Sequence, residues 1–204
     1  MQRILGTFFL VALVASGGFL ADSRAGEDGF TKLFNGKDLA GLKIVPEKAT
    51  DTFKVEDGII KVSGKPNGYF HTEKSYKNFV LRFDWRYPNN AGNSGLLVYI
   101  QSPHKVWPKC IEVQGAYGSH GSIFSIGGAK GKYKDDGKAR KAALKNHKEW
   151  HTTEVVSIDG KLTAKINGIV VCEGQTDAIS EGQLGWQSEG APIDFRNILI
   201  KETK

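Results

Sequence analysis

Apolar and polar side chains alternate with a period of two along much of the chain, which is the pattern of β-strands with one buried face. The longest alternating run is Phe79–Tyr87. Its two predicted faces carry Leu81, Phe83 and Trp85 on one side, and Arg82, Asp84 and Arg86 on the other. Ser94–Gln101 is apolar enough to be buried on both faces, and Lys105–Gly115 alternates again after Pro108. We expect these last two strands to pair, with Ser122–Ile126 next to them.

Turn dipeptides separate many of these runs. Asp57-Gly58, Asp159-Gly160 and Asn167-Gly168 each lie between apolar segments and favour hairpin turns, because such turns need positive φ. The last two predict a three-stranded meander over Trp150–Glu173. About a dozen short strands without strand–helix alternation indicate an all-β fold, an antiparallel sandwich or jelly roll.

One segment departs from the strand pattern. Gly127–Lys148 is rich in glycine and lysine, and within it Lys138–Lys145 is expected to form one or two helical turns. This lysine-rich insertion has two interpretations. It is either a solvated loop beside a binding site or a segment that binds an acidic glycan.

The N-terminus has the composition of an export signal. Arg3 precedes the uncharged apolar run Ile4–Val14, and Ser23-Arg24-Ala25 predicts cleavage after Ala25. An uncleaved membrane anchor is the alternative, since the apolar stretch can be extended to Leu20. We therefore expect residues 1–25 to be a signal peptide, residues 26–204 to be one β-sandwich domain, and the mature protein to be periplasmic or extracellular.

Charge and cysteine content narrow the function classes. The full chain carries a formal charge of +6, which falls to +5 when Arg3, Arg24 and Asp22 leave with the signal. This mild excess does not indicate a nucleic-acid partner. Cys110 and Cys172 lie in apolar strands, where a disulfide or two buried free thiols are both possible, and free thiols are slightly favoured.

Several catalytic chemistries have no motif in this sequence. The five histidines are scattered and the two cysteines lie far apart, so the sequence does not support a zinc site. No serine lies in a G-x-S-x-G turn, and the phosphate-loop and dinucleotide patterns are missing.

Polar residues on two strands point instead to a groove. In Lys105–Gly115, Ile111 and Val113 should face the core, whereas Cys110, Glu112 and Gln114 face the other way. If Asp84 and Arg86 line the same sheet surface as Glu112 and Gln114, these residues form the floor of a binding groove. The alternative for Glu112 and Gln114 is a solvated outer face, and for Arg82, Asp84 and Arg86 a ladder of cross-strand ion pairs.

Other candidate ligand contacts lie near these strands. Trp107 and Tyr99 are rings on which a sugar can stack, while Trp85 belongs by alternation to the core. The remaining candidates are the loop residues Asn93 and Ser94, the later polar pair Gln187 and Glu189, and two histidines, His71 and His120, that would matter only if the fold brings them to the groove.

An ordered set of short motifs resembles the 3-keto-disaccharide hydrolase family, also called DUF1080. The set spans essentially all of Glu27–Lys204 and comprises Gly29-Phe30, Leu33–Leu39, Val55–Gly58, Phe79–Arg86, Asn93–Gly95, Lys105–Lys109, Ile111–Gln114, Glu149-Trp150, Asn167-Gly168, Gln187–Gly190 and Phe195–Ile198.

The resemblance implies a concanavalin A-like lectin/glucanase fold and an exported protein that hydrolyses 3-keto-glycosides. It places Glu112 and Gln114, Asn93–Gly95, and Arg82, Trp85 and Arg86 at family motif positions. Two departures matter. Related sandwich glucanases have an E-x-D-x-x-E strand, of which only Glu112 is present here. Many relatives have His near the position of Glu189.

A 3-keto sugar offers a reaction that needs only one base. The ketone acidifies the proton on C2, so a base can remove it, the C1 group can leave by elimination, and water can then add. We expect Glu112 to be the base or a cation ligand, Arg86 or a bound divalent cation such as calcium to steady the enolate, and Gln114 to orient the sugar. Asp84 completes the predicted catalytic set.

Two other functions fit the same residues. A non-catalytic, lectin-like module needs the aromatic rings and the polar floor but no proton transfer. A structural domain of the cell envelope needs no soluble ligand.

Overall fold

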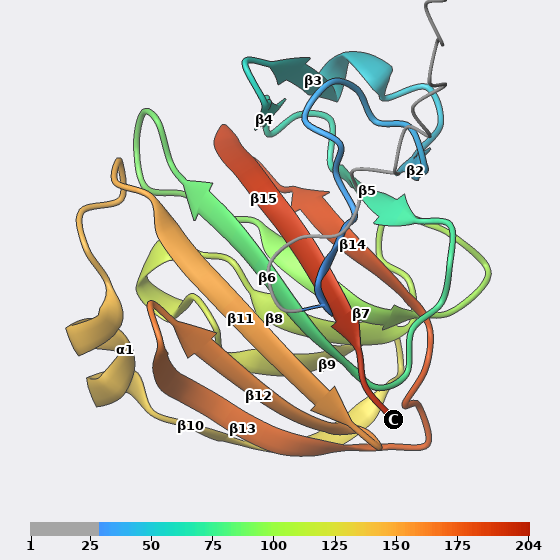
Figure 1. Cartoon of the computed structure of the whole chain (residues 1–204), viewed down its shortest axis with the longest axis vertical. Coiled ribbons are helices and arrows are strands. Elements are labelled where there is room, and N and C mark those ends of the chain that lie inside the picture. Colours follow the sequence, from blue (N-terminus) through green and yellow to red (C-terminus); the bar gives the residue numbers. More distant parts are fainter. Residues whose placement is uncertain (1–28) are drawn as a thin grey trace, which may run out of the picture.

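The computed structural model describes residues 29–204, so the predicted signal peptide lies outside the described residues. Two antiparallel sheets are stacked face to face, and one short helix, α1, lies at the side (Figure 1). The predicted all-β sandwich of concanavalin A-like architecture is confirmed. No helix within residues 29–204 is long and apolar enough to cross a membrane.

The larger sheet has nine strands in the order β10-β13-β12-β11-β6-β15-β4-β3, with β1 also pairing β15. Their bounds are β1 Thr31–Lys32, β3 Phe53–Glu56, β4 Ile59–Val62, β6 Phe79–Arg86, β10 Lys130–Asp135, β11 His151–Ile158, β12 Lys161–Ile166, β13 Ile169–Asp177 and β15 Ile193–Glu202.

The smaller sheet has six strands in the order β2-β5-β14-β7-β8-β9. Their bounds are β2 Leu42–Val45, β5 Gly68–Thr72, β7 Gly95–Ile100, β8 Cys110–Gln114, β9 Ile123–Ile126 and β14 Gln183–Ser188. The predicted order of β7, β8 and β9 is confirmed. The helical segments are α1, Gly137–Ala143, and the short 3₁₀ turns η2, Thr50–Thr52, and η3, Tyr117–Ser119.

An aromatic cluster joins the sheets. Phe70 of β5 stacks on Trp186 of β14, with ring centroids 5.2 Å apart, and both rings belong to the smaller sheet. Phe83 of β6 and Phe195 of β15 approach from the larger sheet, each edge-on to one of these rings at about 6 Å. Such edge and stacked pairs add to the stabilisation from burial alone.

Trp85 is also part of the core, as its alternation predicted. Its ring lies between the imidazoles of His120 and His151, at 3.8 Å and 4.3 Å between centroids. Burial lowers the pKa of His120 to about 3, so its ring is neutral, and its nitrogens bond to Thr153 and the Gly115 carbonyl. His120 is therefore a core residue and not a proton carrier.

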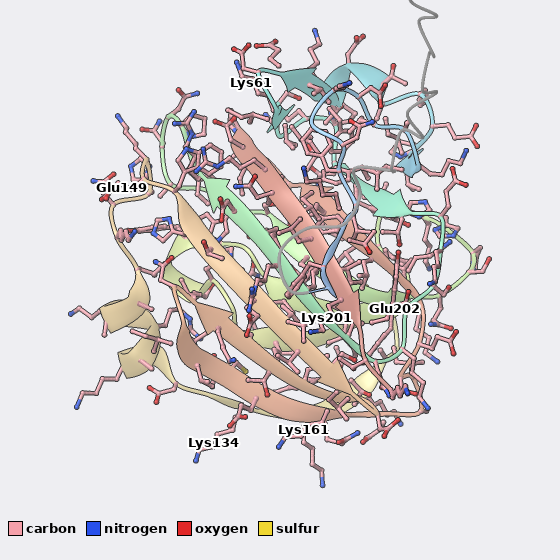
Figure 2. All side chains as sticks on the ribbon, in the orientation of Figure 1. Lys61, Lys134, Glu149, Lys161, Lys201 and Glu202 are labelled. Atoms are coloured by element: carbon pink, nitrogen blue, oxygen red, sulfur yellow. The ribbon has the colours of Figure 1, made fainter. Side chains whose placement is uncertain are left out.

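The lysine-rich insertion is more ordered than expected. It forms edge strand β10 and then α1, and the predicted helical turns are confirmed. The β10 lysines are exposed, and Figure 2 shows Lys134 and Lys161 pointing outward at this edge of the molecule. Lysines on an edge strand discourage further strand pairing, so the solvated interpretation agrees with the structure.

Both cysteines are buried free thiols, in agreement with the expectation that was slightly favoured. Cys110 is in β8 of the smaller sheet, whereas Cys172 is in β13 of the larger one.

The predicted meander β11–β12–β13 is present, and Asn167 begins its second turn with a φ of 48°. Its Oδ1 accepts a bond from the Thr152 N–H at 2.9 Å, and its Nδ2 donates to the Ala143 carbonyl at 2.9 Å. We expect Asn167→Ala to lower the free energy of unfolding by about 2 kcal/mol in urea, because it loses both bonds and disfavours positive φ. Asn167→Asp, which keeps the acceptor, should lose less. Equal stability of the Ala variant and the wild type would contradict this account of the turn.

Candidate functional site

Glu112 and Asp84 lie on different sheets, so the expectation that they share one groove floor is wrong. Glu112 and Gln114 are in β8 of the smaller sheet, whereas Asp84 and Arg86 are in β6 of the larger sheet. Each residue faces away from the inter-sheet core, and the core therefore separates the two pairs. Alternation along a strand identifies the polar face correctly, but it cannot say to which sheet the strand belongs.

The β6 residues form the ladder of ion pairs that was the alternative interpretation. Asp84 accepts bonds from Thr152 at 2.7 Å, Asn197 at 2.8 Å and Arg196 at 3.2 Å. Arg86 donates to Asp194 at 2.8 Å. In the same ladder, Glu154 bonds to both Arg82 and Lys165. These groups hold one another, and Arg86 is on the wrong side of the sandwich to steady an enolate near Glu112.

Glu112 is the central ionisable group of the opposite face. Strand pairing places it in one row with Leu97, Gly185 and His71, across β8, β7, β14 and β5. Its side chain is 7% exposed and makes no hydrogen bond or ion pair with any described residue. Burial, with a smaller contribution from the negative charge of Glu189, raises the pKa of Glu112 to about 7. A carboxyl group in this state can exchange a proton near neutral pH.

Gln187 of β14 lies beside Glu112 above Gly95. A Cβ on Gly95 would lie 2.1 Å from Gln187 Oε1 and 2.7 Å from Glu112 Oε1, so both side chains occupy the space that the missing Cβ leaves. Gln187 is only 1% exposed, yet neither its Oε1 nor its Nε2 has a hydrogen-bond partner among the described residues. A buried amide without partners is costly, and such groups commonly mark a place where a ligand or water binds.

Two further polar groups lie near this pair. Glu189 follows β14, and burial raises the pKa of its carboxyl group. Asn93, in the loop before β7, has a buried Oδ1 without a partner among the described residues. Glu112, Gln187, Glu189 and Asn93 form the candidate site. The negative charge of Glu189 acts on Glu112, so a second carboxyl group lies near it.

The remaining sequence candidates divide between structural and peripheral positions. Gln114 Oε1 accepts bonds from the N–H groups of Gly115 and Ala116, both at 2.7 Å, so this oxygen holds the loop after β8. Ser94 Oγ donates to the Gln187 carbonyl at 2.8 Å and ties β14 to the loop before β7. Tyr99 was expected at the groove and is instead in the inter-sheet core, where its hydroxyl bonds to Ser157. Trp107 is 43% exposed in the loop before β8.

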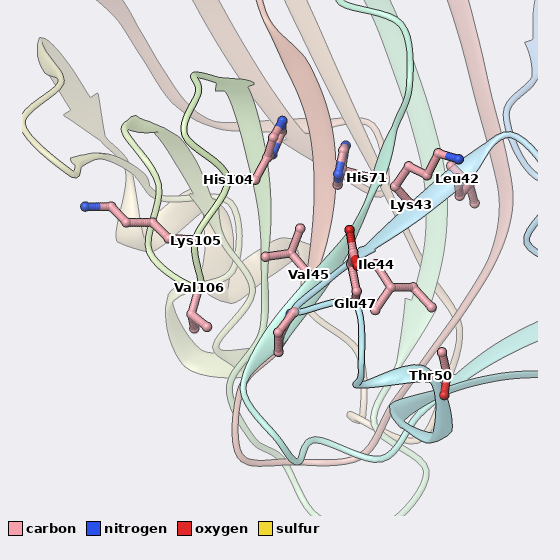
Figure 3. A pocket seen from close by; sticks show the side chains of 11 residues that line it. Leu42, Lys43, Ile44, Val45, Glu47, Thr50, His71, His104, Lys105 and Val106 are labelled. Carbon is pink, nitrogen blue, oxygen red and sulfur yellow. The ribbon is translucent and has the colours of Figure 1, made fainter.

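A pocket of about 930 Å³ lies at the other end of the same sheet face (Figure 3). It is formed by β2 and by the loop residues His104, Lys105 and Val106, and it contains His71 but not Glu112. Sequence analysis missed this pocket because β2 was not predicted. The short run LKIV next to Pro46 was the only available signal.

Among the described residues, no three or more His, Cys, Asp or Glu side chains gather to hold a metal ion. A bound divalent cation at Glu112 was one expectation. The candidate site offers two carboxyl groups and two side-chain amide oxygens as possible ligands for it. No step below depends on a cation.

The family model for the 3-keto-α-glucoside-1,2-lyase-like domain matches residues 29–201. The chain belongs to this family. A comparison with curated protein sequences gave no match. Family membership agrees with the resemblance drawn from the ordered motifs.

Solved structures show the same fold. A candidate glycosyl hydrolase from Parabacteroides distasonis ATCC 8503 superposes with a TM-score of 0.70 at 23% identity, covering 86% of this chain and 94% of that one. A second from the same organism gives 0.65 at 19% identity, with 85% and 99% covered. The carbohydrate-binding module CBM66 of Bacillus subtilis gives 0.56 at 14% identity, with 79% and 96% covered. At these identities the likeness concerns the fold alone.

The raised pKa of Glu112 predicts how stability depends on pH. Below the ordinary carboxyl pKa both folded and unfolded states are protonated, and above it the unfolded state ionises first. The resulting loss of stability grows until pH passes about 7 and remains constant above that pH. We expect Glu112→Gln to match the wild type near pH 4.5 and to exceed it by on the order of 3 kcal/mol at pH 8. Urea unfolding of both proteins between these two pH values measures the difference in the free energy of unfolding. A stability difference that does not change with pH would show that Glu112 is not buried as described.

The unpartnered amide of Gln187 predicts a gain in stability when it is removed. Gln187→Met keeps the shape of the side chain and removes two buried polar groups, so we expect an increase of about 1–2 kcal/mol in the free energy of unfolding. Thermal unfolding followed by circular dichroism measures it. A clear loss of stability would mean that the amide is hydrogen-bonded in the folded protein.

Proposed function

We propose that the protein cleaves the glycosidic bond of 3-keto-α-glucosides by elimination, with Glu112 as the base. The observation that carries the proposal is a carboxyl group with no hydrogen-bond partner, nearly buried, with a pKa of about 7, beside a buried amide that also lacks partners. Membership of the lyase-like family supplies the substrate class.

The chemistry proceeds in balanced steps. The Glu112 carboxylate takes the proton from C2, and the electron pair of that C–H bond moves onto the ketone at C3 to form an enolate. The enolate re-forms the ketone, a double bond forms between C1 and C2, and the C1–oxygen bond breaks. The leaving oxygen takes up a proton, which gives an alcohol and an unsaturated keto sugar. Water added across the double bond would complete a net hydrolysis.

The groups around the reacting sugar fit the remaining roles. The Gln187 Nε2–H group has no partner among the described residues and can donate to the enolate oxygen, the role first expected of Arg86. Once Glu112 has taken the proton from C2, its carboxyl group can give that proton to the leaving oxygen. Burial and the negative charge of Glu189 raise the pKa of Glu112, which makes its carboxylate a stronger base.

The proposal further holds that the protein is exported and acts outside the cytoplasm after cleavage near Ala25. The charged residue before an apolar run and the Ser-Arg-Ala site support this, and both lie outside the described residues.

The decisive variant is Glu112→Gln. We expect it to lower kcat/KM for a 3-keto-α-glucoside at least 100-fold, because general-base catalysis contributes about 10²–10⁴. Wild-type kcat/KM should rise with pH through about 7 as Glu112 ionises. Release of the alcohol, followed by chromatography, measures both.

The matched control is Glu154→Gln, the same change at a part-buried glutamate of the larger sheet. It should leave kcat/KM within twofold of the wild type. Equal turnover by Glu112→Gln and Glu154→Gln would overturn the role of Glu112. If the wild type binds the sugar but releases no alcohol from oxidised or unoxidised glucosides, the protein is a binding module.

A further inference from the structure

The 930 Å³ pocket between β2 and the loop after β7 has a lining unlike that of the Glu112 site. Five of its eleven lining residues are aliphatic, namely Leu42, Ile44, Val45, Pro46 and Val106. The other six are Lys43, Glu47, Thr50, His71, His104 and Lys105. Figure 3 shows Val45 on β2, Val106 on the neighbouring loop, and the imidazoles of His71 and His104 side by side at one end, with the Glu47 side chain pointing toward them. The volume and apolar lining are those of a small-molecule site.

The two histidine rings form a flat, oriented end wall. Their planes are 12° from parallel and their centroids are 4.5 Å apart. His71 Nδ1 lies 2.8 Å from the Thr72 carbonyl, which can only accept, so Nδ1 carries the hydrogen and Nε2 is left as an acceptor. Burial lowers the pKa of His71, which keeps this ring neutral. His104 Nδ1 is 3.3 Å from the Tyr69 hydroxyl, which fixes the second ring.

A second sugar unit fits this pocket less well than an apolar ring, because buried sugar hydroxyls need hydrogen-bond partners. The charged residues of the lining, Lys43, Glu47 and Lys105, are exposed and therefore hydrated. The ammonium of Lys43 is also paired with Glu73 at 3.1 Å. Aliphatic walls and an imidazole end wall suit a flat apolar ring.

The pocket is connected to the Glu112 site by the sheet itself. His71 and Glu112 belong to one cross-strand row, and β5 and β8 are separated by two strands, so their Cα atoms are about 14 Å apart at the usual strand spacing. Tyr69 and Leu97 are fully buried, so the sheet surface between the two sites is covered, whereas Trp107 is 43% exposed in the loop that joins Val106 to β8. A substrate that occupies both sites has to pass over the loop that carries Trp107.

We propose that this pocket binds an aromatic ring, and that in the reaction described above the ring belongs to the leaving alcohol of the 3-keto-glucoside. The leaving-group role rests on the proposed function, whereas the pocket's preference for an aromatic ring does not. The substrate class is thus a 3-keto-glucoside of an aryl-bearing alcohol.

A matched pair of variants tests the pocket. Val106→Asp places a charge in the aliphatic wall, and Val170→Asp makes the same change at an exposed valine of β13 in the other sheet. The first probe is unoxidised 2-phenylethyl α-glucoside with ethyl α-glucoside as reference, and binding to the full chain is measured by calorimetry. We expect the phenylethyl compound to bind at least tenfold more tightly to the wild type and to Val170→Asp, with this preference lost in Val106→Asp. Equal affinity of the wild type for both glucosides, or a preference unchanged in Val106→Asp, overturns the pocket assignment.

The 3-keto forms of the same two glucosides test the leaving-group role. Both carry alkyl alcohols of similar leaving ability, so a difference in kcat/KM reports binding of the ring. The wild-type ratio should be at least ten, and Val106→Asp should bring it close to one by lowering only the phenylethyl value. If both values fall equally, the ring does not lie in the pocket during the reaction. If the phenylethyl probe binds but neither keto-glucoside is cleaved, the proposed function fails together with the leaving-group role, and the aromatic pocket stands.

Discussion

The aromatic contact between the two sheets is the constraint on which the rest of this structure depends. Phe70 and Trp186 from one sheet meet Phe83 and Phe195 from the other, and their burial fixes which face of each strand turns inward. Every polar side chain on the outward faces is then assigned to one of two surfaces separated by the core. The division between a surface of paired charges and one with unpaired polar groups follows from this separation.

The outer faces of the two sheets differ in whether their charged side chains are paired. On the larger sheet the carboxylates of the β6 ladder are paired with cations: Glu154 has Lys165 and Arg82, and Asp84 has Arg196. The pKa of Glu154 is lowered by its partners despite its partial burial. On the smaller sheet Glu112 has no cation nearby, and its burial raises its pKa. The paired face gives stability, whereas the unpaired face retains free energy that a ligand can recover by supplying partners.

The unpaired polar groups on the outer face of the smaller sheet lower the stability of the folded protein, as is typical of functional sites. Gln187 and Asn93 have buried polar atoms that no described residue satisfies, and Glu112 is nearly buried without a hydrogen-bond partner among the described residues. Gly95 leaves room for the side chains of Gln187 and Glu112. A keto sugar brings hydroxyl and ketone groups that can bond to all three. Removal of the unmatched groups should therefore favour stability and oppose activity, which is the trade-off expected where function needs a strained or unsatisfied arrangement.

The sequence by itself determined the class of fold, the turns and the two faces of each strand, because these depend on neighbouring residues. The Asp-Gly and Asn-Gly turns need only local φ angles, and Ile111 alternates with Glu112 wherever the strand is placed. The ordered motifs also singled out Glu112 as a candidate. Only the tertiary structure decided which strands share a sheet. β6 is hydrogen-bonded to β11 and β15, which are far along the chain, so Asp84 and Arg86 do not lie in the predicted groove. The same non-local pairing brought Gln187 beside Glu112 and opened a pocket at β2, since contacts between distant strands have no signature in the local pattern of either one.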